Sequence, residues 1–582
     1  MSSYLETRAY AIPHKAATVP ILLPSSKRNR RIDKIIKMAN LTIRNLTITP
    51  LELKEVERHE DPTKARKPNG LIKITSRLTG KSKTVSTADL NGAAKEPVTK
   101  QDITDVNIQP FSEHETSIPL PDASKGESLR LTFAEPGTPY TYSVDIPGPS
   151  PRSIVMKANQ PESDREFTLI YVPHLSFLAI FSSAHLNRWM AELDPSYPLS
   201  ALSIPGTHNS PTCYVALPSV RCQAVSVREQ LDNGVRFLDV RVSCPSPSSR
   251  SPSPTKTASP PRASTPDSIP GAFPISPTTT QTDTQTQTPT RTDTNPPAPQ
   301  PELSPQAPEQ PVPAYKDKTK GPNLSLVHSA FPIALSGTKY FHDLLSECYA
   351  FLDANPSETV LMSVKREGTG RGTDQNLSTY LANRYLTSDR WYTKAEIPTL
   401  AEARGKMVLV RRFNVDPNLP EAYKGGMGID GSVWPDNCAD GTCGSGKIRI
   451  QDYYEVGQTQ HIEKKIGFAR EELMRAAQQT FVPQGMPGSE AAGGPLPLFI
   501  NFLSGSNFFN ASCWPEKIAA KINPSMIEYL CTGHGAPQKQ PGETTVGDAG
   551  TGIVVTDWVG NNGDWDLIRC IVGWNSRLQW KP

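Results

Sequence analysis

Two histidines of this 582-residue sequence stand where they could act as an acid and a base. His208 follows the apolar run 199–204, and His328 follows the run 324–327. Imidazole exchanges protons near neutral pH, so a pair of histidines can serve as general base and general acid. Arg241 ends another apolar run and could neutralise negative charge on a phosphoryl group. Together these residue types indicate proton transfer at a phosphate ester.

Other apolar runs also end in polar residues with a chemical use. A carboxylate can orient a histidine tautomer, and Asp, Glu and Tyr side chains can hydrogen-bond sugar-like hydroxyls. The candidates at these positions are Asn209, Lys365, Glu367, Arg412, Asp452, Tyr454 and Asp557. No run ends in a cluster of carboxylates suited to a metal. The set therefore predicts metal-independent attack on a phosphodiester by an oxygen nucleophile.

Each of these residues also has a purely structural interpretation. A histidine can be a satisfied structural residue, Arg241 could pair with Asp239 inside the fold, and Asp557 could cap a helix. The functional interpretation is favoured because all the candidates follow the predicted strands at the same end. Chance would place such residues at both ends.

The elements that must position these residues alternate between strands and helices. Alternation of this kind predicts a parallel sheet, and eight strands over about 310 residues predict an α/β fold of the TIM type, a closed β/α barrel. The predicted strands are Leu199–Ile204, Val235–Val240, Leu324–Val327, Thr359–Val364, Met407–Val410, Ile448–Ile450, Leu496–Phe502 and Gly552–Thr556. The predicted helices include Lys339–Asp353, Asn376–Tyr385, Ile462–Gln478 and Trp514–Leu530. The active site of such a barrel lies at the C-terminal ends of its strands.

The barrel is one of several predicted segments. Residues 41–192 alternate apolar and polar positions with a period of two, which predicts a β-sandwich-like N-terminal domain. Residues 193–582 form the barrel, interrupted by residues 245–322, a Pro-, Ser- and Thr-rich insert that we expect to be disordered. Residues 1–40 are predicted to be a disordered basic tail.

Composition excludes several classes of protein. The chain has 61 Lys and Arg against 58 Asp and Glu, so nothing in its net charge of +3 favours a nucleic-acid partner. The most apolar window, 167–181, is too short to span a membrane, and the N-terminus does not resemble a signal peptide. Nine scattered cysteines favour reduced thiols, and the closest pair, Cys438 and Cys443, lacks the partners of a zinc site.

Several motifs resemble the bacterial-type phosphatidylinositol-specific phospholipases C, the X-domain group of the phospholipase C-like phosphodiesterases. The whole chain also resembles fungal members of this superfamily, which carry a similar N-terminal extension. The motifs run in the family's order from about 199 to 557, and they are Ser203–His208, Gly234–Arg241, Ser357–Glu367, Arg411–Arg412, Trp434–Asn437 and Gln451–Tyr454.

The resemblance implies a role for each matched residue. His208 would activate the inositol 2-hydroxyl, Asp557 would orient His208, and His328 would protonate the leaving oxygen of diacylglycerol. Arg241 would neutralise the phosphoryl charge, and the product would be a cyclic inositol phosphate. The residues expected to hold the inositol are Lys365, Glu367, Arg412, Asp436, Asp452 and Tyr454.

The resemblance also bears on metals. Calcium-dependent eukaryotic relatives have acidic ligands where this chain has Arg241 and Lys365, so we expect no cofactor and no required metal. Asn209 replaces an Asp that is thought to assist the general acid in bacterial enzymes, and eukaryotic relatives use an Asn there to help bind calcium. Asn209 thus weakens both the expected rate and the expectation of a metal-free site. Ser329 stands where the bacterial pattern favours glycine.

Two hypotheses of different classes remain. The first is an enzyme that cleaves phosphatidylinositol-type lipids, a monomer in peripheral contact with a membrane, either cytoplasmic or bound at its surface. The second is a catalytically weak or silent barrel that binds a phosphoinositide or an inositol phosphate as an interaction module. A glycerophosphodiester-type enzyme is a third possibility, but its metal ligands are not found.

Overall fold

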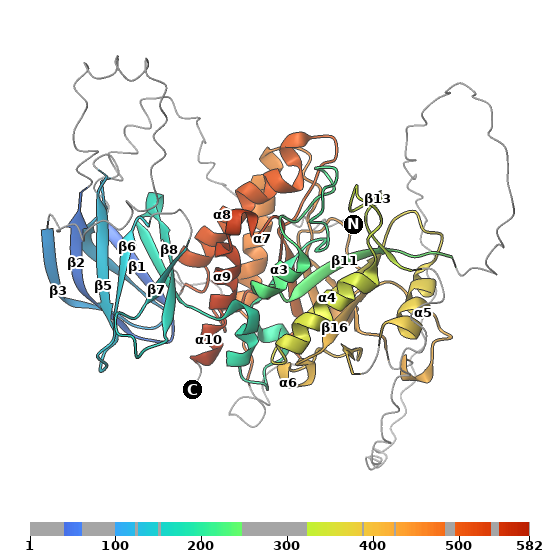
Figure 1. Cartoon of the computed structure of the whole chain (residues 1–582), viewed down its shortest axis with the longest axis horizontal. Helices are drawn as coiled ribbons and strands as arrows, with labels where there is room; N and C mark the ends of the chain where they lie inside the picture. The colour runs from blue at the N-terminus through green and yellow to red at the C-terminus, as the bar shows by residue number, and fades with distance from the viewer. Residues whose placement is uncertain are drawn as a thin grey trace, which may run out of the picture. The chain divides into compact units, whose positions relative to one another are not determined.

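The structure of the protein is a computed structural model (Figure 1), and it divides the chain into two units. Residues 247–312 form one unit, and the rest of the chain forms the other. The structure describes residues 40–60, 99–122, 126–148, 153–246, 323–386, 389–423, 426–482, 495–536 and 546–580. Residues 1–39 of the predicted basic tail, and almost all of the predicted insert, lie outside the described residues, whereas Asn40 begins the first strand.

The first strands of the chain form two sheets. One has the order β4-β1-β9-β8-β7 and the other has the order β3-β2-β5-β6. Their bounds are β1 Asn40–Leu46, β2 Leu51–His59, β3 Thr99–Ile108, β4 Ser112–Pro119, β5 Ser128–Ala134, β6 Thr141–Ile146, β7 Ile154–Lys157, β8 Glu166–Val172 and β9 Phe177–Ser182. All pairs in these sheets are antiparallel except β1 with β9.

Period-two alternation explains which side chains these strands bury. Leu129, Leu131 and Phe133 of β5 are fully buried, and the residues between them point the other way. They share one hydrophobic cluster with Leu41 of β1 and Ile180 of β9, so both sheets contribute to the same core.

The remaining strands form one twelve-stranded sheet with the main path β15-β16-β14-β11-β10-β21-β20-β19-β18. The bounds are β10 Ile204–Thr207, β11 Phe237–Ser243, β12 Ser325–His328, β13 Phe331–Pro332, β14 Val360–Arg366, β15 Trp391–Tyr392, β16 Met407–Arg412, β17 Ile429–Asp430, β18 Gly441–Cys443, β19 Ile448–Gln451, β20 Leu498–Phe502 and β21 Ile553–Thr556. The seven strands from β16 to β19 on this path run parallel. A mixed α/β class with a long, mostly parallel sheet is thus confirmed.

The sheet differs from the expected closed cylinder in its pairing. Within the described residues, no hydrogen-bonded pairing joins β17 to β18, so the path of the sheet is open. Strand β12 was expected to be parallel, but it pairs antiparallel with β11. A parallel crossover needs a connection that packs back on the sheet, usually a helix, and no helical pattern lies between β11 and β12.

The first barrel strand also begins later than expected. Leu199–Ala201 is a 3₁₀-helix, η4, and the strand starts at Ile204. The other predicted strands agree with the observed ones to within three residues, and so do the four predicted helices.

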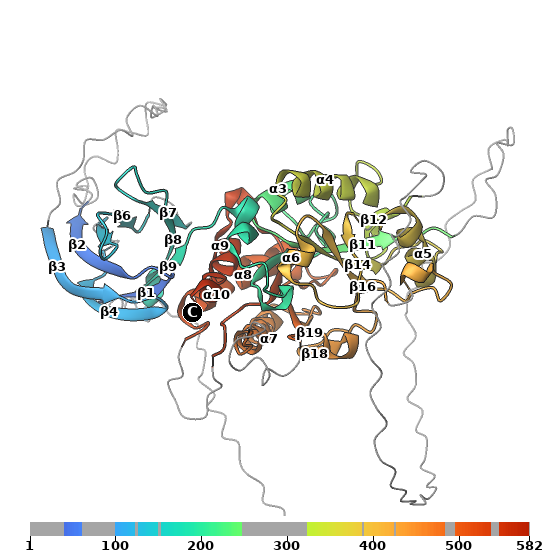
Figure 2. The same cartoon turned by 90° about the horizontal axis from the view of Figure 1, so that it is seen from below.

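Helices cover the outside of this sheet, and α3 and α4 lie on the same side of β11 in both views (Figures 1 and 2). The α-helices are α3 Val227–Asp232, α4 Phe341–Ala354, α5 Asp374–Arg384, α6 Leu400–Ala403, α7 Gln460–Ala477, α8 Pro515–Thr532, α9 Asp566–Gly573 and α10 Ser576–Gln579. The 3₁₀-helices are η2 Pro173–Leu175, η3 Leu186–Glu192, η4, η5 Glu421–Tyr423, η6 Gly444–Gly446, η7 Ala511–Cys513 and η8 Asn561–Gly563.

Local sequence sets where these helices begin. The Thr373 hydroxyl accepts a hydrogen bond from the amide of Asn376, whose side chain bonds back to the amide of Thr373, so α5 starts with a capping box. Pro515 stands in the first turn of α8, where its missing amide proton costs no hydrogen bond. Helix α4 buries Phe341, Leu344 and Leu345 along one face, as its amphipathic pattern predicts.

A buried arginine joins the N-terminal sheets to the helices. Arg44 of β1 donates to the carbonyl oxygens of Cys531 at 3.1 Å and of His534 at 2.9 Å, at the C-terminal end of α8. Its charge suits the negative end of the helix dipole. Within the described residues, the structure has no helix that combines the length and the hydropathy needed to cross a bilayer.

His534 makes this junction sensitive to acid. Burial, with a smaller repulsion from Arg44, lowers the pKa of His534 to about 4, although its bond to the Ala549 carbonyl opposes the shift. The folded state therefore binds fewer protons than the unfolded state, whose histidine titrates near pH 6.5. The contribution to stability is complete above about pH 6.5 and is lost as the pH falls toward about 4. At 1.36 kcal/mol per pKa unit, it is on the order of 3 kcal/mol.

We expect His534→Gln to flatten the pH dependence of the free energy of unfolding between about pH 6.5 and 4, because glutamine keeps an N–H for Ala549 but does not titrate. Urea unfolding followed by tryptophan fluorescence at several pH values measures this slope. His185→Gln is the matched control, since His185 is exposed. Equal slopes in the wild type and His534→Gln would contradict the assignment.

Candidate active site

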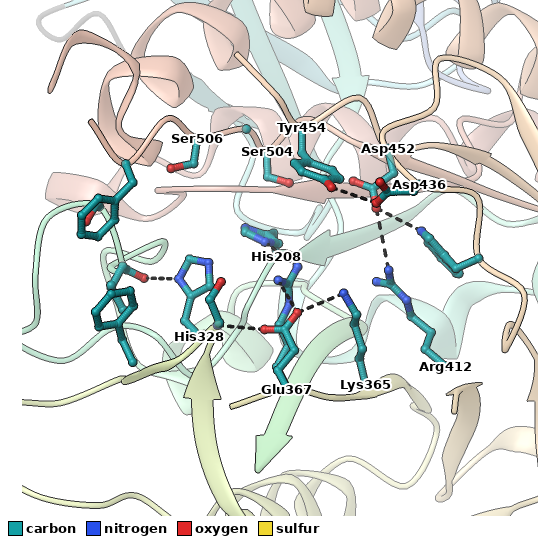
Figure 3. Close-up of a pocket in the computed structure, with 18 residues that line it drawn as sticks. His208, His328, Lys365, Glu367, Arg412, Asp436, Asp452, Tyr454, Ser504 and Ser506 are labelled. Carbon is teal, nitrogen blue, oxygen red and sulfur yellow. Dashed lines mark hydrogen bonds and ion pairs between the residues drawn. The ribbon is translucent and has the colours of Figure 1, made fainter. Parts of the chain in front are cut away.

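A cavity of about 410 Å³ lies at the C-terminal ends of the parallel strands. Figure 3 shows the side chains of several different strands converging on it. The lining includes His208, Arg241, His328, Lys365, Glu367, Arg412, Asp436, Asp452 and Tyr454, which are nine of the eleven predicted site residues. The other two, Asn209 and Asp557, are buried directly beside His208.

The geometry of His208 follows from the pairing of β10 with β21. Thr207 and Thr556 are register partners, so the next residues, His208 and Asp557, lie side by side at the end of the sheet. Asp557 Oδ1 lies 3.0 Å from His208 Nδ1. Gln223 holds both partners, because its Nε2 donates to the His208 carbonyl at 2.7 Å and to Asp557 Oδ1 at 3.3 Å. Asp557 is therefore not a helix cap.

Arg241 fixes the tautomer of His208. Its Nη2 lies 2.9 Å from His208 Nε2, and a guanidinium can only donate hydrogen bonds. Nε2 must then accept with its lone pair, so the proton of the neutral ring is on Nδ1, which donates to Asp557. This is the form in which His208 can take up a proton at Nε2.

Two carboxylates hold Arg241 in place. Its Nε lies 3.3 Å from Asp239 Oδ2, and its Nη1 lies 3.0 Å from Glu367 Oε1. Burial alone would raise the pKa of both acids, but nearby cations, Arg241 foremost, hold the pKa of Asp239 and of Glu367 near 2. Arg241 therefore does pair with Asp239, as its structural interpretation predicted. It makes this contact together with the contact to His208.

His328 faces His208 across the cavity. The two ring centroids are 5.8 Å apart, with an angle of 86° between the ring planes. His328 Nδ1 lies 2.8 Å from the Val220 carbonyl, which can only accept, so Nδ1 carries a proton. Burial, followed by repulsion from Arg241 and His208, lowers the pKa of His328 to about 3. An anion bound between the rings would favour the protonated form.

Asn209 forms hydrogen bonds through its backbone but not through its side chain within the described residues. Its backbone amide donates to Asp239 Oδ2 at 3.2 Å, but within the described residues its buried side-chain oxygen and nitrogen have no hydrogen-bond partner. Asn209 and Ser329 both have positive φ angles, 46° and 53°. Asparagine tolerates a positive φ angle. Glycine adopts a positive φ angle without steric cost, which explains why the bacterial pattern favours glycine at the position of Ser329.

The remaining residues form a polar wall opposite the histidines. Lys365 Nζ lies 3.0 Å from Glu367 Oε1, and the hydroxyl of Tyr454 donates to Asp436 Oδ1 at 2.8 Å. The guanidinium carbon of Arg412 lies 3.8 Å from the centre of the Trp434 ring. This wall alternates donors and acceptors, which suits a ligand with many hydroxyl groups.

Several lining residues were not predicted. Trp434 donates to Asp452 Oδ2 at 3.0 Å, and Phe331 stacks on Phe508 with centroids 5.5 Å apart at the mouth. Trp434 stood inside a recognised motif, and that signal could have identified it. Val220 and Phe508 lie on loops and Phe331 lies on the short strand β13, and the sequence of these segments carries no comparable motif.

Two histidines that face each other beside an arginine form a site whose chemistry suits a phosphate ester. Comparison with known proteins adds the family: residues 195–413 match the family model "Phosphatidylinositol-specific phospholipase C, X domain". The resemblance predicted from the sequence is thus confirmed for this part of the chain.

Curated relatives of low identity are named 1-phosphatidylinositol phosphodiesterase. A 1-phosphatidylinositol phosphodiesterase of Staphylococcus aureus (strain Newman) is 25% identical over 242 residues, which are 38% of this chain and 65% of the relative. One of Listeria monocytogenes is 23% identical over 241 residues, 40% of this chain and 50% of the relative. The chain thus spans between half and two thirds of the length of these relatives.

Two solved structures align with the chain at low similarity. A phosphatidylinositol-specific phospholipase C from Staphylococcus aureus aligns with a TM-score of 0.42 and 18% identity, covering 67% of this chain and 97% of that one. The enzyme from Listeria monocytogenes aligns with a TM-score of 0.38 and 17% identity, covering 67% and 99%.

The charge of Glu367 should matter for stability. Glu367→Gln leaves Arg241 and Lys365 with one counter-ion fewer, and removal of one partner from a buried ion pair costs about 3–5 kcal/mol. Because the pKa of Glu367 is depressed to about 2, the loss should be complete above about pH 4.5 and should vanish as the pH falls toward about 2.

Urea unfolding of Glu367→Gln at about pH 7 and about pH 3 measures both points. Glu396→Gln is the control, because Glu396 is exposed and pairs with Lys447 at 3.8 Å, so its loss should cost less than about 1 kcal/mol. Equal effects of the two substitutions at about pH 7 would contradict a buried charge network.

Proposed function

We propose that this protein cleaves phosphatidylinositol-type lipids to diacylglycerol and a cyclic inositol phosphate. The observation that carries the proposal is the pair of histidines, 5.8 Å apart across one cavity, with Arg241 bonded to the first of them. The names of the curated relatives support the same substrate.

His208 is the proposed general base. A phosphate oxygen would compete for Arg241 Nη2 and free the lone pair on His208 Nε2. That lone pair would take the proton of the inositol 2-hydroxyl while the hydroxyl oxygen bonds to phosphorus. The buried carboxylate of Asp557 would stabilise the resulting imidazolium, and Arg241 would neutralise the developing phosphoryl charge.

His328 is the proposed general acid. The Val220 carbonyl holds a proton on Nδ1, so a second proton on Nε2 makes the ring an imidazolium. The negative charge of the substrate would stabilise that form. As the bond from phosphorus to the glycerol oxygen breaks, Nε2 would protonate the leaving oxygen and diacylglycerol would depart.

The polar wall is the proposed inositol site. Lys365 and Arg412 would donate to the hydroxyls, and Glu367, Asp436 and Asp452 would accept from them. Tyr454 would stack on the ring. Attack by a hydroxyl of the same molecule gains from the fixed geometry of the ring.

No metal is required in this mechanism. The residues do not fit the calcium site of the eukaryotic relatives, because Arg241 already lies 3.3 Å from Asp239 and 3.0 Å from Glu367, and Lys365 lies 3.0 Å from Glu367. The side chains of Arg241 and Lys365 already form ion pairs with the carboxylates that a calcium ion would need as ligands. The calcium-binding use of the asparagine is therefore not proposed for Asn209.

We expect the purified protein to release cyclic inositol phosphate from phosphatidylinositol vesicles, with the same turnover in the presence of a chelator. His208→Ala should lower turnover by about 10²- to 10⁴-fold, because it removes the base. His342→Ala is the matched control, a partly exposed histidine on α4. Phosphorus NMR or separation of the products measures the reaction. A collapse of activity in chelator would contradict the metal-free mechanism.

The second hypothesis is a silent binding module. The lack of a hydrogen-bond partner for the side chain of Asn209 within the described residues favours it, because Asn209 then gives the general acid no support. Vesicle binding without product, in the wild type and in His208→Ala alike, would establish this alternative.

Contact with a membrane is part of the proposal. Six exposed apolar side chains lie on the loops that also line the cavity, and we call them the apolar rim: Val215, Leu217, Leu335, Val433, Phe508 and Phe509. Phe509 is 95% exposed, and Val433 is 81% exposed. A lipid surface would cover these groups while the headgroup enters the cavity.

Phe509→Ser should weaken binding to phosphatidylinositol vesicles by about 10- to 100-fold, since burial of a phenylalanine is worth about 1.5–3 kcal/mol. Hydrolysis of a water-soluble, short-chain phosphatidylinositol below its micelle concentration should not change. Met474→Ser is the control, an exposed residue of α7 outside the rim. Vesicle sedimentation measures the binding of the wild type, Phe509→Ser and Met474→Ser. Equal binding by all three proteins would contradict a role of the apolar rim in membrane contact.

The remaining parts of the proposal concern organisation. We propose a β-sandwich-like domain at 41–192, a barrel-type domain at 193–582 whose sheet has an open path within the described residues, and a disordered insert at 245–322. We also propose a monomer with no nucleic-acid partner, located in the cytoplasm or at a membrane surface.

A further inference from the structure

A buried cysteine lies beside the proposed general acid and has no part in the mechanism above. Cys222 Sγ is 3.8 Å from His328 Nδ1, and its side chain is fully buried. Its position is fixed, because its amide donates to Thr212 Oγ1 at 3.1 Å and its carbonyl accepts from Trp558 at 2.9 Å.

Cys222 completes a set of metal-ligand types. Its sulfur, one ring nitrogen of His208 and one ring nitrogen of His328 all lie within 4.8 Å of one another. Zinc binds imidazole nitrogen at about 2.0–2.1 Å and thiolate sulfur at about 2.3 Å, so neighbouring ligands of a tetrahedral ion are about 3.4–3.6 Å apart. Shifts of about 1 Å would bring the three atoms to that geometry.

We infer that His208, Cys222 and His328 form an inhibitory binding site for zinc or a similar borderline-soft divalent cation. The three residues supply three ligands, and the cavity leaves room for a water or a phosphate oxygen as the fourth. Calcium and magnesium prefer oxygen ligands and should not compete.

The surroundings of His208 favour this role. Asp557 Oδ1 lies 3.0 Å from His208 Nδ1, and a carboxylate on the second ring nitrogen is the usual support of a metal-bound histidine. The support directs the lone pair of Nε2 into the cavity, where an ion would bind.

Two contacts must give way when the ion binds. Arg241 Nη2 leaves His208 Nε2, and Arg241 keeps Asp239 and Glu367 as partners. The thiol of Cys222 gives up its long contact of 3.5 Å to the Val220 carbonyl and releases its proton to solvent as the sulfur–zinc bond forms. No electron is transferred.

The inhibition of lipid cleavage by zinc rests on the proposed function, whereas the binding of zinc to the three residues does not. An ion bound to His208, Cys222 and His328 would occupy the lone pair of His208 that takes the substrate's proton. It would also hold the imidazole of His328, which must donate a proton to the leaving oxygen. Catalysis would therefore stop while the fold stays intact.

Cobalt(II) is the probe for the site, because a cobalt–thiolate bond gives a charge-transfer band in the near ultraviolet. We expect titration of the full-length protein with cobalt(II) to produce this band together with the visible bands of tetrahedral cobalt. Cys222→Ser should lose the charge-transfer band. Cys348→Ser, at a buried free cysteine of α4, should keep it.

Zinc-edge X-ray absorption of the wild type needs no variant. It should show one sulfur ligand at about 2.3 Å and two or three nitrogen or oxygen ligands at about 2.0 Å. A shell of nitrogen and oxygen alone, or a cobalt spectrum unchanged by Cys222→Ser, would overturn the site.

The inhibition is tested separately on phosphatidylinositol vesicles in zinc-free buffer, each variant being compared with its own metal-free rate. Zinc should inhibit the wild type and Cys348→Ser with equal potency, and Cys222→Ser at least 10-fold more weakly. Equal potency in all three would overturn inhibition through Cys222. A protein without lipid cleavage would refute the proposed function alone, since the spectroscopic experiments would still decide the site.

Discussion

The arrangement of the cavity depends on the cost of holding three cations side by side, of which Arg241 and Arg412 are mostly buried and Lys365 is partly exposed. The register of β11, β14 and β16 pairs Arg241 with Lys365 and Lys365 with Arg412, and paired residues of adjacent strands point to the same face. Buried charges are tolerated only with opposite charges and hydrogen bonds around them. The carboxylates of Asp239, Glu367 and Asp452 therefore have to stand where they do.

This charge network also determines the state of His208. Because Asp239 and Glu367 fix two nitrogens of Arg241, the third is directed at His208 Nε2. A donor in that place excludes a proton on Nε2 and leaves it as a lone pair. In the proposed mechanism the same guanidinium would turn to a phosphate oxygen, so one residue would couple the binding of an anion to the release of that lone pair.

The sequence was sufficient for the features that strand periodicity controls. Alternating apolar runs located the strands, and the residues after them, such as His208 after β10 and Lys365 within the end of β14, line the cavity as predicted. Periodicity says nothing of strand direction, so the antiparallel β12 was missed. It also says nothing of loop conformation, which brings Val220 and Cys222 to His328 from more than a hundred residues away.

Asn209 is the departure from the bacterial pattern that most affects the choice between an enzyme and a silent barrel. Its φ of 46° and its amide bond to Asp239 give this position a structural task that asparagine performs as well as aspartate does. An aspartate would add a negative charge next to Asp239, whose Oδ1 has no hydrogen-bond partner within the described residues. Asparagine avoids that repulsion and leaves the contacts of His208, Arg241 and Asp557 intact. In the proposed mechanism the substitution would therefore weaken the support of the general acid and leave the base intact, and a slower enzyme fits that outcome better than a barrel that only binds.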